Sequence, residues 1–416
     1  MAENKRENGT TSSIHGISTQ LKKMRLKDWE GLFFIVAAFI PGKIWKALHN
    51  NIWVISEYEN LARDNGYWFF KYVRENHGEI EAYYPISDKS PDYEKIAKIG
   101  NTVAFESFKH YCLFWAANKY IGTTKCFGFP YRRICEDLVQ WNLHGFKYVF
   151  LNHGFTRGYS SIVDARETNY DMVITCGEQD SKVIIEDNGQ PDYKVRCLGY
   201  ARHDSLNDDI LDRKQILIMP TWRRWLNNPL TANPDEADQN ERLFLESEYY
   251  KKYNELINNR ELIDFLEDKG LHLVFYLHEY AQTYSHLFSS VSDRIIVGTN
   301  ENYDIQQLLK QSVVLITDYS SVCYDFSYMH KPVVYYQFDH DEFEEKQYAS
   351  GNNFSYETNG FGKQIFDEHN VIEEIKQLYM NDFKMPSLYL ERADAFFKYH
   401  DRNNCKRIFD AILKMD

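Results

Sequence analysis

The sequence predicts an α/β fold made of two Rossmann-like, doubly wound domains that face each other across a cleft. The chain has 416 residues, more than one hydrophobic core usually serves, so two domains are expected. Short runs rich in β-branched residues alternate with amphipathic stretches, which indicates parallel sheets with helices between the strands. The alternation occurs twice, before and after the polar segment 199–213.

Two series of expected strands define the domains. The first series lies at 52–56, 81–86, 102–105, 119–122, 148–152 and 172–176, with a helix expected over 67–76. The second series lies at 215–219, 271–277, 295–298, 313–317 and 332–336, with a long surface excursion over 227–262. We therefore divide the chain into a segment 1–48, a first domain 49–205 and a second domain 206–416.

Charge and cysteine content limit the class of protein. The net charge of −13 disfavours a general nucleic-acid binder, because such proteins normally carry a basic field over the binding face. The first 48 residues differ, with eight Lys or Arg against four Asp or Glu. Seven cysteines without a CxxC pair fit a reducing compartment, so we expect a cytoplasmic location.

An apolar run, GLFFIVAAFIP at 31–41, lies within the basic N-terminal segment. Its eleven residues fall short of the about 20 that a membrane-crossing helix needs, so we do not expect it to span. Lys and Arg precede it at 22–27, and Lys43, Trp45 and Lys46 follow it, as is typical of a segment at the surface of an anionic membrane. The alternative is a buried N-terminal helix or strand of the first domain.

Residues that follow the strands are the candidates for a binding site, because ligands of open parallel sheets bind beyond the carboxyl ends of the strands. Asp318, Ser320 and Ser321 follow the strand at 313–317 and precede a helical pattern. Free backbone N–H groups at a helix start attract anions, and serine hydroxyls add donors. The alternative is an ordinary N-cap, for which Asp and Ser are common.

Two histidines occupy comparable positions. His153 follows YVFLN and precedes Gly154, which would let a ligand come close, and His278 follows LVFYL. A histidine near neutral pKa is the usual general base for a hydroxyl proton, although either could be structural. We expect no metal, because no third ligand lies at a recognisable spacing.

Thr221 and Arg223 follow the strand at 215–219, which Pro220 ends. An arginine offers a planar fork of donors that suits phosphate. A solvated basic pair, Arg223 with Arg224, is the alternative.

Several motifs in a fixed order carry a resemblance to a known family: 52–77 (IWVISEYENLARDNGYWFFKYVRENH), 151–158 (LNHGFTRG), 199–206 (GYARHDSL), 216–226 (ILIMPTWRRWL), 274–280 (VFYLHEY), 315–339 (LITDYSSVCYDFSYMHKPVVYYQFD) and 356–362 (YETNGFG). Together they resemble the CDP-glycerol glycerophosphotransferase family of teichoic-acid and capsule-type polymerases and primases. The resemblance covers most of the chain. It implies a two-domain GT-B architecture, direct transfer of the inverting type, and peripheral attachment to the inner face of the cell membrane.

The resemblance also implies roles for single residues. It places the family's two essential histidines on His153 and His278, its TWR arginine on Arg223, and its donor-phosphate serines on Ser320 and Ser321. Thr221 is a further donor-phosphate candidate, and Gly154, Arg202 and Asp318 are other cleft candidates.

The sequence departs from the family pattern at two positions. Ala201 replaces the usual proline before Arg202, which should only loosen a turn. Glu279 replaces the proline after His278 and puts a carboxylate beside the imidazole, so the pKa and role of His278 stay open.

The reaction implied is transfer of a polyol phosphate from CDP-glycerol or CDP-ribitol to a hydroxyl of a glycan or polyol-phosphate acceptor, including a lipid-linked one. The first domain would face the acceptor and the second would hold the CDP donor. We expect the acceptor hydroxyl to attack the phosphorus nearest the polyol, with His153 as base and CMP leaving.

The expected partners are this donor, this acceptor and the cytoplasmic membrane surface, with no nucleic acid and no required cofactor. Two alternatives remain at this point. One is a GT-B glycosyltransferase that uses a nucleotide sugar, and the other is an inactive CDP-binding scaffold of a capsule assembly complex.

Overall fold

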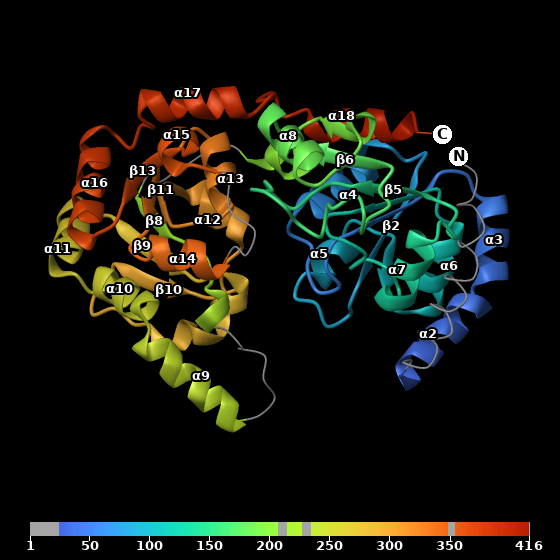
Figure 1. Cartoon of the computed structure of the whole chain (residues 1–416), viewed down its shortest axis with the longest axis horizontal. Coiled ribbons are helices and arrows are strands. Elements are labelled where there is room, and N and C mark those ends of the chain that lie inside the picture. Colours follow the sequence, from blue (N-terminus) through green and yellow to red (C-terminus); the bar gives the residue numbers. More distant parts are fainter. Residues whose placement is uncertain (1–24, 207–213, 227–233, 348–353, 416) are drawn as a thin grey trace, which may run out of the picture. The chain divides into compact units, whose positions relative to one another are not determined.

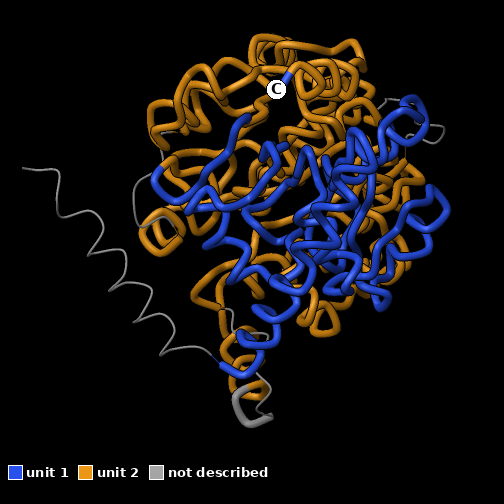
Figure 2. The backbone as a smooth tube through the Cα atoms, turned by 90° about the vertical axis from the view of Figure 1, so that its right-hand side faces the viewer, with its two compact units in different colours: residues 1–151, 166–172, 415 blue, residues 152–165, 173–414, 416 orange. Residues whose placement is uncertain are grey.

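The computed structural model describes residues 25–206, 214–226, 234–347 and 354–415 (Figure 1). Internal contacts divide the chain into unit 1, comprising 1–151, 166–172 and 415, and unit 2, comprising 152–165, 173–414 and 416 (Figure 2). The boundary predicted at 205/206 adjoins residues 207–213, which lie outside the described residues, and the predicted domain limits stay a prediction.

The first sheet is parallel and has the strand order β3-β2-β1-β4-β5-β6-β7. Its strands are β1 (Ile52–Ser56), β2 (Glu81–Ile86), β3 (Thr102–Ala104), β4 (Lys119–Gly122), β5 (Lys147–Phe150), β6 (Met172–Thr175) and β7 (Val195–Cys197). The helices around it are α4 (Asn65–Asn76), α5 (Tyr93–Ala97), α6 (Phe108–Ala116), α7 (Arg132–Gln140) and α8 (Glu178–Glu186). Every residue of the interior strand β1 is buried, as is usual for a parallel strand covered on both faces.

Two consecutive helices open the described chain, α2 (Leu26–Ala37) and α3 (Phe39–Leu48). Pro41 lies in the first turn of α3, where its missing N–H and its ring prevent one continuous hydrogen-bond ladder. Together, Leu26–Leu48 form a helical stretch of 23 residues that contains an 18-residue window with a mean hydropathy of 1.6, long and apolar enough by length and composition to cross a membrane. The prediction that this region is too short to span therefore does not follow from length.

The second sheet lies in unit 2 and has the order β10-β9-β8-β11-β12-β13. Its strands are β8 (Gln215–Ile218), β9 (His272–Tyr276), β10 (Ile295–Gly298), β11 (Ser312–Thr317), β12 (Val333–Tyr336) and β13 (Gly362–Ile365), all parallel. This is the doubly wound order, in which the chain starts at the centre, builds one side and returns to build the other. The reversal falls between β8 and β11, where such sheets bind ligands.

The remaining helices of unit 2 are two short ones before β8 and those between or after the strands of this sheet. They are η1 (Asp192–Lys194), η2 (Ala201–Ser205), η3 (Arg224–Leu226), α9 (Pro234–Glu246), α10 (Glu248–Ile257), α11 (Arg260–Lys269), η4 (Glu279–Leu287), α12 (Ile305–Gln311), α13 (Val322–Tyr328), α14 (His340–Gln347), α15 (Tyr356–Asn359), α16 (Glu368–Met380), α17 (Ser387–Phe396) and α18 (Asn404–Leu413).

Two hydrophobic cores cover the two faces of the second sheet. Successive side chains of a strand point to opposite faces, and in β8 Ile216 and Ile218 belong to one core whereas Leu217 belongs to the other. The first core includes buried residues of α10, α11 and α16, and the second includes those of α12, α13 and α17. Because both faces are packed, the functional side chains are left to the edge where the strands end.

The parallel α/β prediction is confirmed, and the predicted strands agree with the observed ones to within two residues at each end. Two strands were not predicted, β7 and β13, which are the last strands of their sheets. Both are short, with the sequences VRC and GKQI, and each contains an exposed basic residue next to a partly buried one. The excursion over 227–262 contains α9 and α10 and the start of α11.

Candidate functional site

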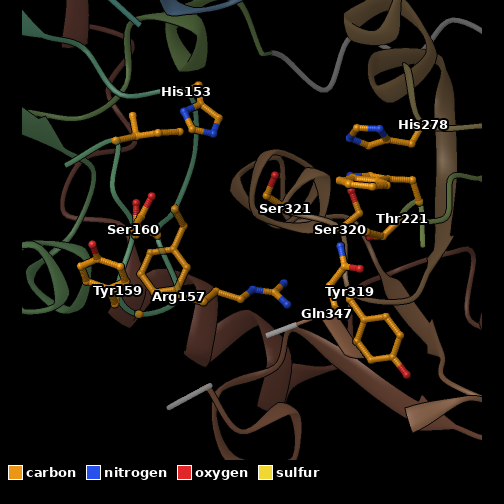
Figure 3. A pocket seen from close by; sticks show the side chains of 15 residues that line it. His153, Arg157, Tyr159, Ser160, Thr221, His278, Tyr319, Ser320, Ser321 and Gln347 are labelled. Carbon is orange, nitrogen blue, oxygen red and sulfur yellow. The ribbon is translucent and has the colours of Figure 1, made fainter. Parts of the chain in front are cut away.

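A pocket with a cavity of about 360 Å³ lies in unit 2 at the carboxyl edge of the second sheet (Figure 3). Thr221 follows β8, His278 follows β9, and Tyr319 to Ser321 follow β11, so the pocket sits at the reversal of strand order. A second wall comes from the segment after β5. The lining residues are His153, Phe155, Thr156, Arg157, Gly158, Tyr159, Ser160, Ile162, Thr221, Trp222, His278, Tyr319, Ser320, Ser321 and Gln347.

The turn that carries His153 is held by side-chain hydrogen bonds. Asn152 has a left-handed backbone with φ of 61°, a conformation that Asn tolerates better than most residues. Its Oδ1 accepts hydrogen bonds from the backbone N–H of His153 at 2.9 Å and of Gly154 at 3.4 Å. The His153 side chain is exposed and lies on one wall of the pocket, with His278 on the other (Figure 3).

Arg202 holds the same turn from behind and does not line the pocket. Its Nη1 donates to the His153 carbonyl at 3.0 Å, and its Nε donates to both oxygens of Asp325, each at 3.0 Å. Burial would raise the Asp325 pKa, but Arg202 and a hydrogen bond from His203 keep it below its ordinary value. Since Asp325 lies on α13, Arg202 ties the His153 turn to the helix that begins after Ser321.

Arg223 does not reach the pocket either. Its side chain is fully buried and pairs with Asp339, at 2.7 Å from Nε, and with Asp318, at 2.9 Å from Nη2. The rings of Tyr319 and Phe343 lie 5.1 and 4.8 Å from the guanidinium. The prediction that Arg223 binds donor phosphate does not fit this placement, because two carboxylates already neutralise it away from the cavity.

Asp318 is likewise a buried support and lines no part of the pocket. One carboxylate oxygen accepts from the backbone N–H of Thr221 at 2.8 Å, and the other accepts from the Tyr253 hydroxyl at 3.2 Å. Arg223 also donates to the Thr221 carbonyl at 2.6 Å. Asp318 and Arg223 therefore fix both sides of Thr221, whose own hydroxyl is buried without a hydrogen-bond partner in the described structure.

The serines after β11 line the pocket as predicted. Ser320 is 7% exposed, and its hydroxyl accepts weakly from the backbone N–H of Val322 at 3.4 Å. Ser321 is the N-cap residue of α13 and makes no side-chain capping bond, so its exposed hydroxyl does not serve the helix as an ordinary N-cap would. Gly154 lies beside this point, since a Cβ added there would sit 3.6 Å from the Ser321 hydroxyl.

His278 is neutral at ordinary pH because burial lowers its pKa to about 4. Its Nδ1 accepts from the backbone N–H of Tyr280 at 3.3 Å, which leaves the proton on Nε2. Glu279, whose carboxylate accepts from Asn300 at 3.3 Å, is not among the causes of the shift. The substitution at Glu279 thus leaves His278 a neutral hydrogen-bond donor and not a cation.

Sequence reasoning missed several residues of the site. Arg157, Tyr159 and Ser160 line the pocket, although Arg157 stands within the motif that contains His153. The available sequence signal was the position of Arg157, a cation four residues after the candidate base His153. Asp325 and Asp339 were also missed, because nothing in the sequence shows which arginine each one meets.

One group of potential metal ligands lies elsewhere in the described structure. Ligand atoms of His330, Asp394 and His400 lie within 4.8 Å of one another, and His330 Nε2 is 2.9 Å from Asp394. All three are exposed, and none lines the pocket. They could hold a divalent cation at the surface.

We expect Arg223→Ala to lower the free energy of unfolding by about 3–5 kcal/mol, because it leaves two buried carboxylates without their cation. Urea unfolding measures this change. The matched control is Arg224→Ala, an exposed neighbour for which the change should stay within about 0.5 kcal/mol. Equal stability of the two variants would contradict a structural role for Arg223.

Comparisons with known proteins agree with the resemblance. The family model for CDP-Glycerol:Poly(glycerophosphate) glycerophosphotransferase matches residues 43–414. The Minor teichoic acid biosynthesis protein GgaB of Bacillus subtilis (strain 168) is 30% identical over 369 residues, 88% of this chain and 40% of that protein. The Teichoic acid poly(glycerol phosphate) polymerase of the same strain is 21% identical over 393 residues, 83% of this chain and 46% of that protein. The chain spans less than half the length of these relatives.

Solved structures share the fold. The wall teichoic acid polymerase TagF aligns with a TM-score of 0.64 at 16% identity, covering 99% of this chain and 98% of that chain. A putative UDP-N-acetylglucosamine 2-epimerase from Listeria monocytogenes aligns with a TM-score of 0.54 at 15% identity, covering 88% of this chain and 98% of that chain. These alignments support the predicted GT-B-like two-domain architecture. With a family model matched over residues 43–414, the chain belongs to the CDP-glycerol:poly(glycerophosphate) glycerophosphotransferase family.

Proposed function

We propose that the protein transfers glycerol phosphate, or another polyol phosphate such as ribitol phosphate, from a CDP-activated donor to a hydroxyl of a glycan or polyol-phosphate acceptor. The observation that carries this proposal is the pocket itself. It places an exposed histidine, His153, on one wall and a set of neutral phosphate donors, Thr221, His278, Ser320 and Ser321, on the other. Family membership supports the CDP-linked donor.

The proposed reaction is a single displacement at phosphorus. The acceptor oxygen bonds to the phosphorus nearest the polyol, the bond from that phosphorus to the bridging oxygen breaks, and CMP leaves with the bond's electron pair. His153 takes the acceptor proton, a contribution of about 10² to 10⁴ in rate. The larger share would come from positioning and from donors aimed at the transferred group.

The neutral state of His278 suits this role. A neutral imidazole with its proton on Nε2 donates one hydrogen bond to a phosphate oxygen. Because it carries no positive charge, it adds no ionic attraction that would hold the CMP product in the site. The Thr221 hydroxyl has no hydrogen-bond partner in the described structure, and the Ser321 hydroxyl makes no capping bond to α13. Both hydroxyls would donate further hydrogen bonds to the phosphates. Trp222 and Tyr280 pack around the imidazole, with the Tyr280 ring stacked 5.6 Å from it.

A second proposal concerns the membrane. We propose that α2 and α3 lie on an anionic membrane surface at its cytoplasmic side, with the acceptor at that surface. Their exposed residues Trp29, Phe33, Val36, Ile40, Ile44 and Leu48 recur every three or four positions and so form one apolar stripe. Seven free cysteines support a reducing compartment.

The packing of the opposite face favours lying on the membrane over crossing it. Gly31 lies against Tyr131 and Gly42 lies against the backbone of Cys112, so side chains would not fit there. Asp28 near the start of the stretch pairs with Arg133 at 2.7 Å, and Lys46 near its end donates to the Ala117 carbonyl at 2.8 Å. Contacts near the start, the middle and the end of α2 and α3 thus fasten these helices to the rest of unit 1, which favours a position on the membrane surface.

Incubation of the protein with different activated donors tests the proposed transfer. We expect the full chain to release CMP from CDP-glycerol or CDP-ribitol when an acceptor is supplied, with the product mass raised by one polyol phosphate, and no release of UDP from UDP-sugars. His153→Ala should lose about 10² to 10⁴ of the rate, whereas His369→Ala, an exposed histidine, should keep it. Release of UDP with transfer of a sugar would contradict the proposal, and full activity of His153→Ala would remove the base.

The pH dependence of CDP binding tests the state of His278. A cationic histidine would bind phosphate best at low pH, so its contribution would fall as pH rises through its pKa. With a pKa of about 4, His278 stays neutral from about pH 5.5 to about pH 8, a range that spans the ordinary histidine value. We therefore expect the ratio of CDP dissociation constants, His278→Ala over wild type, to be the same at both ends by calorimetry. A ratio that shrinks toward high pH would show a cation instead.

Vesicle sedimentation tests the membrane contact. Phe33→Ser with Ile40→Ser should weaken binding to vesicles containing anionic phospholipid by at least about tenfold, since each large apolar side chain contributes about 1.5–3 kcal/mol on burial. The matched control is Val291→Ser with Met380→Ser, two apolar residues that are 81% and 77% exposed elsewhere. Unchanged binding of the first pair, or equal loss in the second, would refute this surface.

A further inference from the structure

The pocket has few positive charges to balance a bound diphosphate. A CDP-linked donor brings two negative charges, yet the groups predicted to hold it are neutral or remote. His278 is a neutral imidazole, and Arg223 is buried against Asp318 and Asp339. Among the described residues that line the pocket, Arg157 is the only Lys or Arg.

Arg157 is held in place by aromatic side chains. Its guanidinium lies 4.9 Å from the ring centre of Phe354, 5.2 Å from that of Tyr356 and 5.8 Å from that of Tyr324. Nη1 also donates to the Tyr356 hydroxyl. A guanidinium that stacks on rings has a fixed orientation, so less side-chain freedom is lost when it binds a ligand.

Arg157 contacts the first turn of α13, the helix that begins directly after the two serines. Nη2 lies 3.9 Å from Sγ of Cys323, and Cys323 and Tyr324 form the first turn of α13. Ser320 and Ser321 immediately precede that turn. The guanidinium is therefore anchored beside the segment that supplies the serine hydroxyls, and Figure 3 shows it extended into the space that Ser320, Ser321 and Gln347 border.

We propose that Arg157 is the cation of the donor diphosphate site, with Tyr356 as its positioning residue. This inference rests on the proposed function for the identity of the ligand, a nucleoside diphosphate ester. The planar fork binds non-bridging phosphate oxygens. It also stabilises the negative charge that develops on the CMP phosphate as the bond to the transferred phosphorus breaks, so both binding and turnover depend on it.

A role confined to packing is the competing explanation, and ligands that differ only in phosphate separate the two. CDP carries the diphosphate, and cytidine carries the same base and sugar without it. We expect Arg157→Gln to weaken CDP binding by about tenfold to a hundredfold, the range of a hydrogen bond to a charged group, and to leave cytidine binding unchanged. Calorimetry follows CDP, and ligand-observed NMR follows the weaker cytidine.

Three further variants sharpen the test. Arg157→Lys should restore part of the CDP affinity, since it keeps the charge and loses the fork. Tyr356→Phe should lower kcat/KM for CDP-glycerol by less than Arg157→Gln does, because the rings still hold the guanidinium. Arg392→Gln is the matched control, since Arg392 donates to the carbonyls of Gly360 and Glu357 and does not line the pocket.

The outcomes distinguish this inference from the proposed function. Wild-type CDP affinity in Arg157→Gln, or an equal loss of CDP and cytidine binding, overturns the role of Arg157 whatever the wild type transfers. Arg157-dependent CDP binding in a wild type that transfers no polyol phosphate supports the role of Arg157 and overturns the transfer. A wild type that binds no CDP contradicts both.

Discussion

The buried contact of Arg223 with Asp318 and Asp339 is the interaction on which the site depends. One cation and two carboxylates, none of them exposed to solvent, join the loop after β8 to the segments after β11 and β12. Charges in such a place are costly unless fully paired and hydrogen-bonded. Here Asp318 and Arg223 also hold the backbone of Thr221. The wall of the pocket therefore keeps its shape only while this buried cluster stays intact.

A second buried pair plays the same part on the other wall. Arg202 and Asp325 connect the carbonyl of His153 to α13, the helix preceded by Ser320 and Ser321. The residues that face the cavity are thus mostly small or neutral, whereas the strong charges stand behind them and set their positions. Arg157 is the exception, a cation held by aromatic rings at the cavity itself.

Much of the fold could be predicted from local sequence patterns. Runs such as IWVIS and QILIM are apolar and β-branched, and the structure confirms them as β1 and β8. Ligands bind beyond the carboxyl ends of parallel strands, and this rule correctly placed His153, Thr221, His278, Ser320 and Ser321 at one pocket. The last strands β7 and β13 were not predicted because they bury only part of their surface and lack an apolar run.

Local sequence patterns were enough to predict the parallel α/β class, the places where strands end, and the residue types available there. The roles of the three arginines were decided only by tertiary structure, since Arg202, Arg223 and Arg157 look alike in a sequence and differ in what surrounds them. Two of them meet carboxylates from segments over a hundred residues away, and the third meets aromatic rings and a cavity. The charge of His278 was decided in the same way, because burial, which no local pattern encodes, lowers its pKa to about 4.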